Sequence, residues 1–288
     1  MPPATRPSYG HIEVTPRVRA LRATFRTMGT LAPGLAARLA EELFCRPPRA
    51  LPRAHEDAFL ARGTRFTVDA GPWPLAAWRW GAGARTVVLL HGWGSRAARF
   101  HALGDALVGA GFTCVAFDGP AHGRTPGRRA SMPEFAQALR AVVDAVGPVH
   151  AAVGHSMGGA VIALALHDGL PIERAVLLAP PADPEQFSHL FARLLHIPER
   201  ARRRMEENLE RRFRVRWRDL HIPTLVRGHA VPALVVHDTD DTDVAWAEGQ
   251  AIAEAWPGAT LMTTSGLGHR AVIRDPAVVA RVVQFLAA

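Results

Sequence analysis

The chain contains no lysine, so arginine carries all of its positive charge. Lysine and arginine together number 34 against 26 aspartates and glutamates, which gives a formal net charge of +8. The arginines are spread along the whole chain, and no nucleic-acid-binding motif accompanies them. Because alanine, glycine and proline are also abundant, we attribute the charge to compositional bias and predict no nucleic-acid partner.

Cysteine and long apolar runs are equally scarce. The two cysteines, Cys45 and Cys114, are too few for a disulfide framework. No run approaches the roughly 20 apolar residues that span a bilayer, and the first residues lack the apolar stretch of a signal peptide. Metal and dinucleotide motifs such as His-Glu-x-x-His are missing, so we expect no metal and no organic cofactor. These absences predict a cytoplasmic protein without stable membrane insertion.

The most informative stretch is Gly-His-Ser-Met-Gly-Gly at 154–159, which follows an apolar run and precedes another. A strand, a Gly-x-Ser-x-Gly turn and a helix form a nucleophile elbow. Such a turn is so tight that its serine takes a strained backbone conformation, and the neighbouring residues must lack side chains. The pattern therefore presents the hydroxyl of Ser156 above the sheet edge, beside the start of a helix.

A second motif lies upstream of the elbow. The apolar strand pattern at 86–90 runs into His-Gly-Trp-Gly-Ser at 91–95. A loop of this kind supplies one backbone N–H of an oxyanion hole, and the residue after the nucleophile supplies the other. We assign these two donors to the amides of Trp93 and Met157.

Two further pieces come downstream and supply an acid and a base. A buried strand pattern at 231–236 leads into a loop with four carboxylates, and residues alone do not single one out. A later Gly-Leu-Gly-His turn ends at His269. The order serine, aspartate, histidine is that of one hydrolase fold and differs from the orders of chymotrypsin and subtilisin. The four carboxylates are Asp238, Asp240, Asp241 and Asp243.

Together with Asp-Gly-Pro-Ala-His-Gly-Arg-Thr at 118–125, these motifs resemble the α/β-hydrolase family. In that family the triad acid commonly follows a strand as His-Gly-x-x-Asp-x-x-Val, so the resemblance implies Asp241, with Asp240 and Asp238 as alternatives. An aspartate stands here where the family has the glycine. The resemblance gives the 118–125 turn a structural role and implies a catalytic triad of Ser156, Asp241 and His269.

The expected fold is α/β, with a mostly parallel central sheet flanked by helices. We expect an N-terminal helical extension at 1–62, a core at 63–183 and 229–288, and a small helical cap inserted at 184–228. The cap carries an apolar stripe expected to cover an acyl pocket. Apolar residues at helical spacing within the basic segment 17–53 indicate an amphipathic helix, which either packs on the body or makes weak peripheral contact with lipid.

The predicted function is hydrolysis of carboxylic esters or thioesters of small molecules through an acyl-enzyme. Two alternatives stay open: an acyltransferase using the same triad, and a non-enzymatic binding protein that retains the fold. Dehalogenases and epoxide hydrolases of this fold use an aspartate at the elbow, so Ser156 disfavours both.

Overall fold

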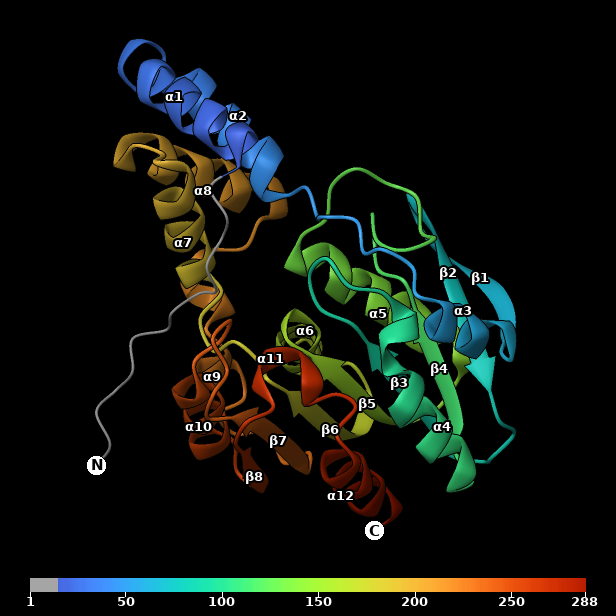
Figure 1. Cartoon of the computed structure of the whole chain (residues 1–288). Helices are drawn as coiled ribbons and strands as arrows, with labels where there is room; N and C mark the ends of the chain where they lie inside the picture. Colours follow the sequence, from blue (N-terminus) through green and yellow to red (C-terminus); the bar gives the residue numbers. More distant parts are fainter. Residues whose placement is uncertain (1–14) are drawn as a thin grey trace. The chain divides into compact units, whose positions relative to one another are not determined.

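Eight strands form one sheet within residues 15–288, the part of the chain that the computed structural model describes. Their spatial order is β1-β2-β4-β3-β5-β6-β7-β8 (Figure 1). The pairs β1–β2 and β2–β4 are antiparallel, and all other neighbours are parallel. This mostly parallel sheet confirms the predicted α/β class. The strands are β1 (Thr64–Ala70), β2 (Trp73–Trp80), β3 (Thr86–Leu90), β4 (Thr113–Phe117), β5 (Val149–His155), β6 (Ile172–Leu178), β7 (Ala233–Asp238) and β8 (Ala259–Thr264).

The central strands are buried along nearly their whole length because helices cover both faces of the sheet. Helices α4 and α12 contact each other, whereas α5, α6, α9 and α10 form a second chain of contacts. The helices of this part are α3 (Ala54–Ala61), η1 (Ala97–Phe100), α4 (His101–Gly109), α5 (Met132–Val146), α6 (Met157–His167), α9 (Ile222–Leu225), α10 (Trp246–Ala255), α11 (Gly268–Ala271) and α12 (Pro276–Ala287).

The parallel strands place the sequence motifs at one edge of the sheet. Strands β3, β5, β7 and β8 run in the same direction, so their carboxyl ends meet at the same edge. The expected oxyanion loop, Ser156, the acidic loop and the His269 turn each follow one of these ends. Ligands of open α/β sheets bind at such an edge.

The chain divides into two units whose boundaries differ from the expected segments. The core unit, Pro47–Ala182 and Ile222–Ala288, holds the sheet, and the helical unit joins the described residues up to Arg46 with Asp183–His221. The expected extension ran to residue 62, but α3 lies in the core unit, where Phe59 stacks on Trp80 at 4.3 Å. The expected cap ran to residue 228, but the chain re-enters the core unit at Ile222, whose N–H donates to Ala182.

The helical unit has an apolar core of its own. Its helices are α1 (Pro16–Leu31), α2 (Pro33–Phe44), α7 (Glu185–Leu195), α8 (Glu199–Phe213) and η2 (Trp217–Leu220). Phe25 is fully buried there, and Phe44 packs edge-on against Phe191 at 5.3 Å. The amphipathic N-terminal segment therefore packs on the inserted helices. Phe191 belongs to the apolar stripe that was expected to cover an acyl pocket, and it packs against this core instead. In the N-terminal segment, Leu31 and Leu35 are exposed.

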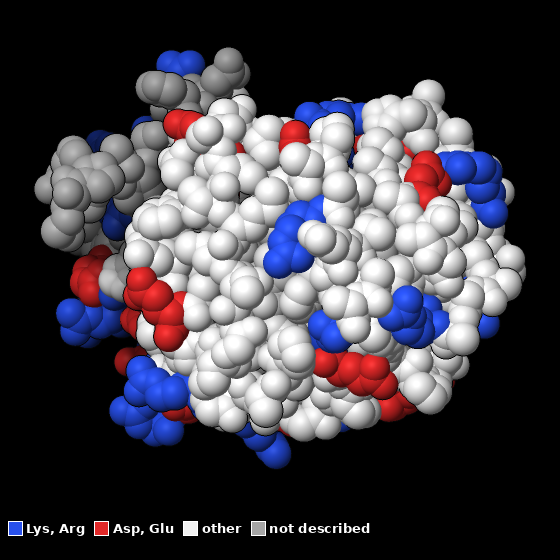
Figure 2. Space-filling view, turned by 90° about the horizontal axis from the view of Figure 1, so that it is seen from below, with Lys and Arg blue, Asp and Glu red and all other residues white. Residues whose placement is uncertain are grey.

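Charge is distributed in small groups on the surface that Figure 2 shows. Arginines and acidic side chains lie there in small groups, several of them with both signs side by side, between wide uncharged areas. This face therefore has no continuous basic patch among its described residues. Within residues 15–288, no helix combines the length and the apolar character that crossing a bilayer requires.

Candidate active site

Ser156 occupies a strained turn between β5 and α6. Its φ of 54° and ψ of −125° lie outside the regions that a residue with a side chain prefers. The close approach of its neighbours explains the glycines. A Cβ at Gly154 would lie 2.4 Å from Gly158, and a Cβ at Gly158 would lie 2.2 Å from the carbonyl oxygen of Leu90. Only glycine therefore lets β5, α6 and the end of β3 come this close.

The loop after β3 lies directly against Ser156. A Cβ at Gly92 would lie 2.9 Å from the Cβ of Ser156 and 2.9 Å from the carbonyl oxygen of His155. The next residue, Trp93, is 37% exposed. Met157 is the first residue of α6, so its N–H has no acceptor within the helix. The assignment of the Trp93 and Met157 amides as oxyanion donors stays a prediction.

His91 fastens this loop to the turn that follows β4. The ring is buried, its Nε2 accepts the N–H of Gly119 at 3.0 Å, and its Nδ1 lies 2.8 Å from the carbonyl oxygen of Gly92. An amide N–H requires an unprotonated Nε2, and the carbonyl requires hydrogen on Nδ1. Burial lowers the pKa of His91 to about 4. The ring is therefore neutral at pH 7, in one defined tautomer.

His122 also holds this loop through hydrogen bonds at both ring nitrogens. Its Nε2 accepts the N–H of Gly94 at 2.9 Å, and its Nδ1 lies 2.8 Å from the carbonyl oxygen of Pro120. Burial lowers the pKa of this histidine to about 3, and its ring packs edge-on against Trp93 at 5.4 Å. Two neutral histidines thus hold the predicted oxyanion loop from both ends.

Asp118 organises the turn that carries His122. The buried carboxylate accepts N–H groups from Ala97 at 2.8 Å and Arg124 at 2.7 Å. Burial raises the pKa of Asp118. A Cβ at Gly123 would lie 2.1 Å from the carboxylate oxygen Oδ2, so this turn tolerates only glycine there. These contacts agree with the structural role that the sequence motif implied.

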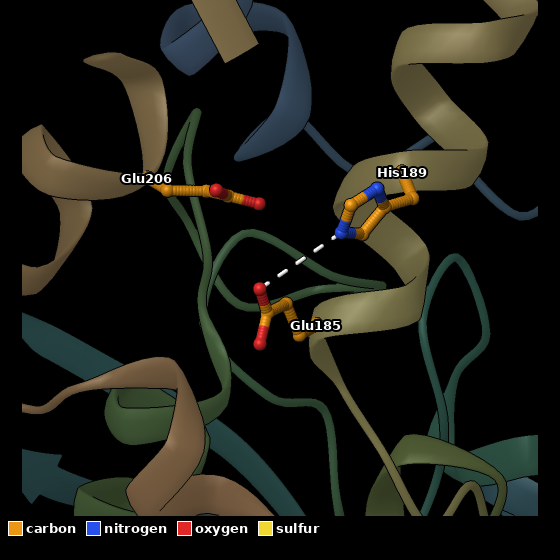
Figure 3. Close-up of side chains that lie close together, drawn as sticks. All are labelled: Glu185, His189 and Glu206. Carbon is orange, nitrogen blue, oxygen red and sulfur yellow. Dashed lines mark ion pairs between the residues drawn. The ribbon is translucent and has the colours of Figure 1, made fainter. Parts of the chain in front are cut away.

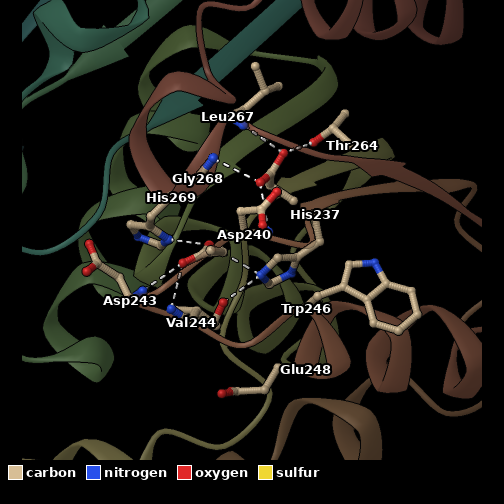
Figure 4. A network of polar contacts seen from close by, with 12 residues as sticks. His237, Asp240, Asp243, Val244, Trp246, Glu248, Thr264, Leu267, Gly268 and His269 are labelled. Atoms are coloured by element: carbon tan, nitrogen blue, oxygen red, sulfur yellow. Dashed lines mark hydrogen bonds and ion pairs between the residues drawn. The ribbon is translucent and has the colours of Figure 1, made fainter. Parts of the chain in front are cut away.

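Asp241 lies against His269. Its Oδ2 is 2.8 Å from Nδ1 of His269, while its Oδ1 accepts the N–H groups of Asp243 and Val244, each at 2.8 Å (Figure 4). Burial alone would raise the pKa of this carboxyl. Hydrogen bonds from His237 and His269 outweigh burial and hold the pKa far below its usual range. The carboxylate is therefore ionised and fixed in orientation.

The two alternative acids hold the loop instead of the imidazole. Asp238 accepts the hydroxyl of Thr264 at 2.7 Å and the N–H of Gly268 at 2.9 Å. Asp240 accepts the N–H of Gly266 at 2.7 Å. Both carboxylates therefore bind groups in the segment just before His269. The geometry favours Asp241 as the partner of the histidine.

His155 joins the elbow to the His269 turn. Its Nε2 lies 2.7 Å from the backbone carbonyl oxygen of His269, and the two rings are 4.8 Å apart. A carbonyl oxygen only accepts, so Nε2 carries the hydrogen. Burial lowers the pKa of His155 to about 3, which keeps the ring neutral. The residue directly before Ser156 thus holds the backbone of the predicted base.

His155 belongs to the elbow motif and His237 directly follows the 231–236 strand pattern, but the motifs assign neither histidine a role. Both are buried polar side chains beside predicted catalytic residues. Their place in the sequence could have pointed to the site, since His155 directly precedes Ser156 and His237 comes four residues before Asp241. A histidine at the end of a buried strand must find hydrogen-bond partners, and the chemical groups nearby belong to the site.

One other group of side chains has the composition of a metal site. Ligand atoms of Glu185, His189 and Glu206, on α7 and α8 of the helical unit, lie within 4.8 Å of one another (Figure 3). Glu206 is already bonded by Ser188 and by the guanidinium of Arg202, which places a positive charge beside the carboxylate. We therefore assign no cation to this group.

Comparisons with known proteins agree with this architecture. Residues 82–281 match the sequence profile of the family described as "Serine aminopeptidase, S33". A monoacylglycerol lipase from Mycolicibacterium smegmatis is 33% identical over 84 residues, which is 26% of this chain. The aligned part spans only 30% of the length of that relative.

Solved structures show the same fold at low identity. The esterase Pf2001 from Pyrococcus furiosus superposes with a TM-score of 0.66 at 20% identity, covering 84% of this chain and 97% of that one. Est1E from Butyrivibrio proteoclasticus, solved with ferulic acid bound, has a TM-score of 0.56 at 15% identity. It covers 77% of this chain and 96% of its own.

Proposed function

This chain belongs to the α/β-hydrolase superfamily of hydrolytic enzymes, and we propose that it cleaves ester or thioester bonds of small molecules through Ser156, Asp241 and His269. The observation that carries the proposal is the 2.8 Å contact between Oδ2 of Asp241 and Nδ1 of His269. The His269 turn is also bonded to the elbow at His155. These contacts support His269 as an oriented base whose turn is held to the elbow that carries Ser156.

The first half of the reaction forms an acyl-enzyme. A neutral serine hydroxyl is a weak nucleophile, so Nε2 of His269 takes its proton while Oγ of Ser156 bonds to the carbonyl carbon. The electron pair of the carbonyl double bond moves to oxygen. Asp241 keeps hydrogen on Nδ1 of His269 and stabilises the imidazolium. His269 then gives its proton to the leaving alcohol or thiol as the carbon–heteroatom bond breaks.

The developing oxyanion needs donors fixed before the reaction begins. We assign them to the amides of Trp93 and Met157, since Gly92 lies against Ser156 and Met157 opens α6. Removal of one such donor typically costs roughly 3 kcal/mol of barrier height. In the second half, His269 activates water, which attacks the acyl carbon and releases Ser156.

Relatives support esters as the substrate class. One relative is named a monoacylglycerol lipase and a structural neighbour is named an esterase. Trp93 is partly exposed and directly follows Gly92, which lies against Ser156, so it favours an uncharged and partly apolar acyl group. Neither organic cofactor nor metal enters this proposed mechanism.

Hydrolysis of p-nitrophenyl acetate, butyrate, octanoate and palmitate tests the proposal, with Ser156→Ala as the inactive variant. Ser131→Ala is a matched control, because that hydroxyl caps α5 and accepts the N–H of Glu134. We expect Ser156→Ala to abolish turnover and Ser131→Ala to lower stability alone. Hydrolysis that survives in Ser156→Ala would contradict the mechanism. Absence of hydrolysis and of serine labelling would favour the non-enzymatic alternative.

The acyltransferase alternative differs only in the acceptor that resolves the acyl-enzyme. Mass spectrometry of products formed with glycerol or methanol present separates the two activities. We expect free acid as the main product. Acyl transfer that dominates at millimolar acceptor would identify a transferase.

Peripheral lipid contact through residues 17–53 is part of the proposal. Exposed Leu31 and Leu35 lie where α1 meets α2, and α1 carries four arginines and no acidic residue. Sedimentation with anionic vesicles tests it on the full chain, using Leu31→Ser combined with Leu35→Ser. Equal sedimentation of the wild-type chain and the double variant would contradict the proposed lipid contact. The proposed location is the cytoplasm, where the protein contacts the membrane surface only peripherally.

A further inference from the structure

A second histidine, His237, lies beside the Asp241 carboxylate. It stands near the end of β7, and its side chain is fully buried. Its Nε2 is 3.0 Å from the carbonyl oxygen of Val244 and 3.4 Å from Oδ2 of Asp241 (Figure 4). Both neighbours are acceptors, so Nε2 must carry the hydrogen. The imidazole N–H therefore bonds the acidic loop at Val244 and lies close to the carboxylate of the proposed triad acid.

The opposite edge of the ring has no hydrogen-bond partner. Nδ1 of His237 is one of the few buried side-chain atoms in the described part of the chain that are left unsatisfied. A Cβ at Gly249, in α10, would lie 2.3 Å from this nitrogen. An unpaired buried polar atom destabilises a fold, so packing alone favours an apolar residue at this position. The reason for a histidine at position 237 therefore lies in the contacts of its Nε2.

His237 and His269 meet on the same carboxylate oxygen. Oδ1 of Asp241 is held by the amides of Asp243 and Val244, whereas Oδ2 faces both imidazoles. A carboxylate with donors on both oxygens cannot rotate about its Cβ–Cγ bond without losing hydrogen bonds. Its Oδ2 lone pair is then directed at Nδ1 of His269.

We propose that His237 is a positioning residue of the triad, which holds the Asp241 carboxylate toward His269 through its Nε2–H. Gly249 provides the space that the ring requires. This inference rests on the proposed function, because it needs Asp241 to act as the triad acid. His237 does not contact the reacting atoms and acts only through Asp241.

Two substitutions separate hydrogen bonding from packing. His237→Met keeps an apolar side chain of similar length and removes the donor, whereas His237→Gln places an amide N–H where Nε2 stood. We expect His237→Met to lower kcat by about 10- to 100-fold with little change in KM. Displacement of a catalytic group by about 1 Å can lower the reaction rate by that factor. We expect His237→Gln to restore most of kcat.

The pH profile of kcat/KM gives a readout that a merely structural role would not move. Its acid limb reports the essential base of the free enzyme, here His269. Without the His237 donor, more of the charge on Asp241 acts on the imidazolium, so the acid limb of His237→Met should move to higher pH. None of the other titratable or charged groups around this pair changes in the variants. These groups are His155 on β5, Asp238 at the end of β7, Asp240 and Asp243 after β7, and Arg270 on α11.

His150→Met is the matched control. His150 lies on β5, its side chain is 11% exposed, and its nitrogens bond Glu173 and the carbonyl oxygen of Leu286, away from the acidic loop. We expect this variant to keep the wild-type kcat and acid limb even if it melts at a lower temperature. Circular dichroism and active-site titration normalise all rates to folded enzyme.

The outcomes separate this inference from the function on which it rests. If Ser156→Ala retains hydrolysis, the proposed function fails, whatever His237 does. If Ser156→Ala is inactive but His237→Met matches wild type in kcat and acid limb, the positioning role is overturned. A loss in His237→Met that His237→Gln does not reverse, or that His150→Met shares, would also overturn it.

Discussion

The imidazole of His155 donates from Nε2 to the backbone carbonyl oxygen of His269 at 2.7 Å. These residues are 114 positions apart in the chain, yet one hydrogen bond joins the strand that ends at the elbow to the turn that carries the proposed base. His155 is buried and neutral, so the bond is present over the whole neutral pH range.

Replacement of His155 by leucine should therefore loosen the His269 turn. The variant loses the donor and leaves a carbonyl oxygen without its partner, which typically costs about 1–3 kcal/mol of unfolding free energy. We expect a lower midpoint of urea denaturation and a kcat reduced about tenfold or more, as expected for a displaced base. Leucine at position 155 with wild-type kcat would show that the bond does not position His269.

Asparagine substitutions distinguish the candidate acids. Asp241→Asn should lower kcat by on the order of 10⁴-fold, because an amide fixes the wrong tautomer of the histidine. Asp240→Asn is the matched control one residue away, and its loss should be small, since Asp240 bonds only loop groups in the structure. Steady-state kinetics on one ester measure both. An active Asp241→Asn enzyme would refute the assignment.

Three buried neutral histidines predict acid sensitivity of the fold. Burial lowers the pKa of His91 to about 4 and those of His122 and His155 to about 3, against about 6.5 in an unfolded chain. Between these values the unfolded chain binds more protons than the folded one. The contribution to stability is thus complete above pH 6.5 and is lost as pH falls toward 3, by on the order of 3 kcal/mol per histidine.

Urea denaturation at pH 7 and pH 4.5 measures this dependence. We expect His122→Gln to be less stable than wild type at pH 7 but to lose less stability on acidification. His55→Gln, at an exposed histidine, is the control and should lose as much as wild type. Equal losses in all three proteins would mean that His122 is not the source of the effect.

A methyl group at Gly92 should disturb the reacting centre. The added Cβ would lie 2.9 Å from both the Cβ of Ser156 and the carbonyl oxygen of His155, so the loop or the elbow must move. We expect Gly92→Ala to lower kcat/KM about 100-fold. Gly109→Ala is the control, because nothing lies within 4 Å of its added carbon. The control should keep full activity and gain up to about 1 kcal/mol of stability in α4.

The elements that could be predicted from sequence are those with local signals. The expected strand at 86–90 is β3, and the apolar run expected before the elbow lies in β5, because buried parallel strands are continuous apolar runs. The elbow glycines were expected for the close approach that the structure displays. The antiparallel strands β1 and β2 were not singled out, since the exposed positions of β1 interrupt its apolar pattern.

Contacts between distant segments could not be predicted. Helical spacing indicated that the N-terminal segment is amphipathic, but the period of a helix does not name the partner of its apolar face. Phe25 of α1 is buried among residues of α7 and α8, more than 160 positions away. In the same way, the bond between His155 and the backbone of His269 depends on the folded sheet, so the sequence motif contained His155 without revealing its partner.

The most direct measurement is the mass of the intact protein after treatment with a fluorophosphonate, followed by peptide mapping. We expect one adduct, on Ser156, formed rapidly by wild type and at least 100-fold more slowly by His269→Ala, since the proposed nucleophile depends on that base. An adduct on another residue, or labelling of Ser156 at the same rate without His269, would contradict the proposed catalytic site.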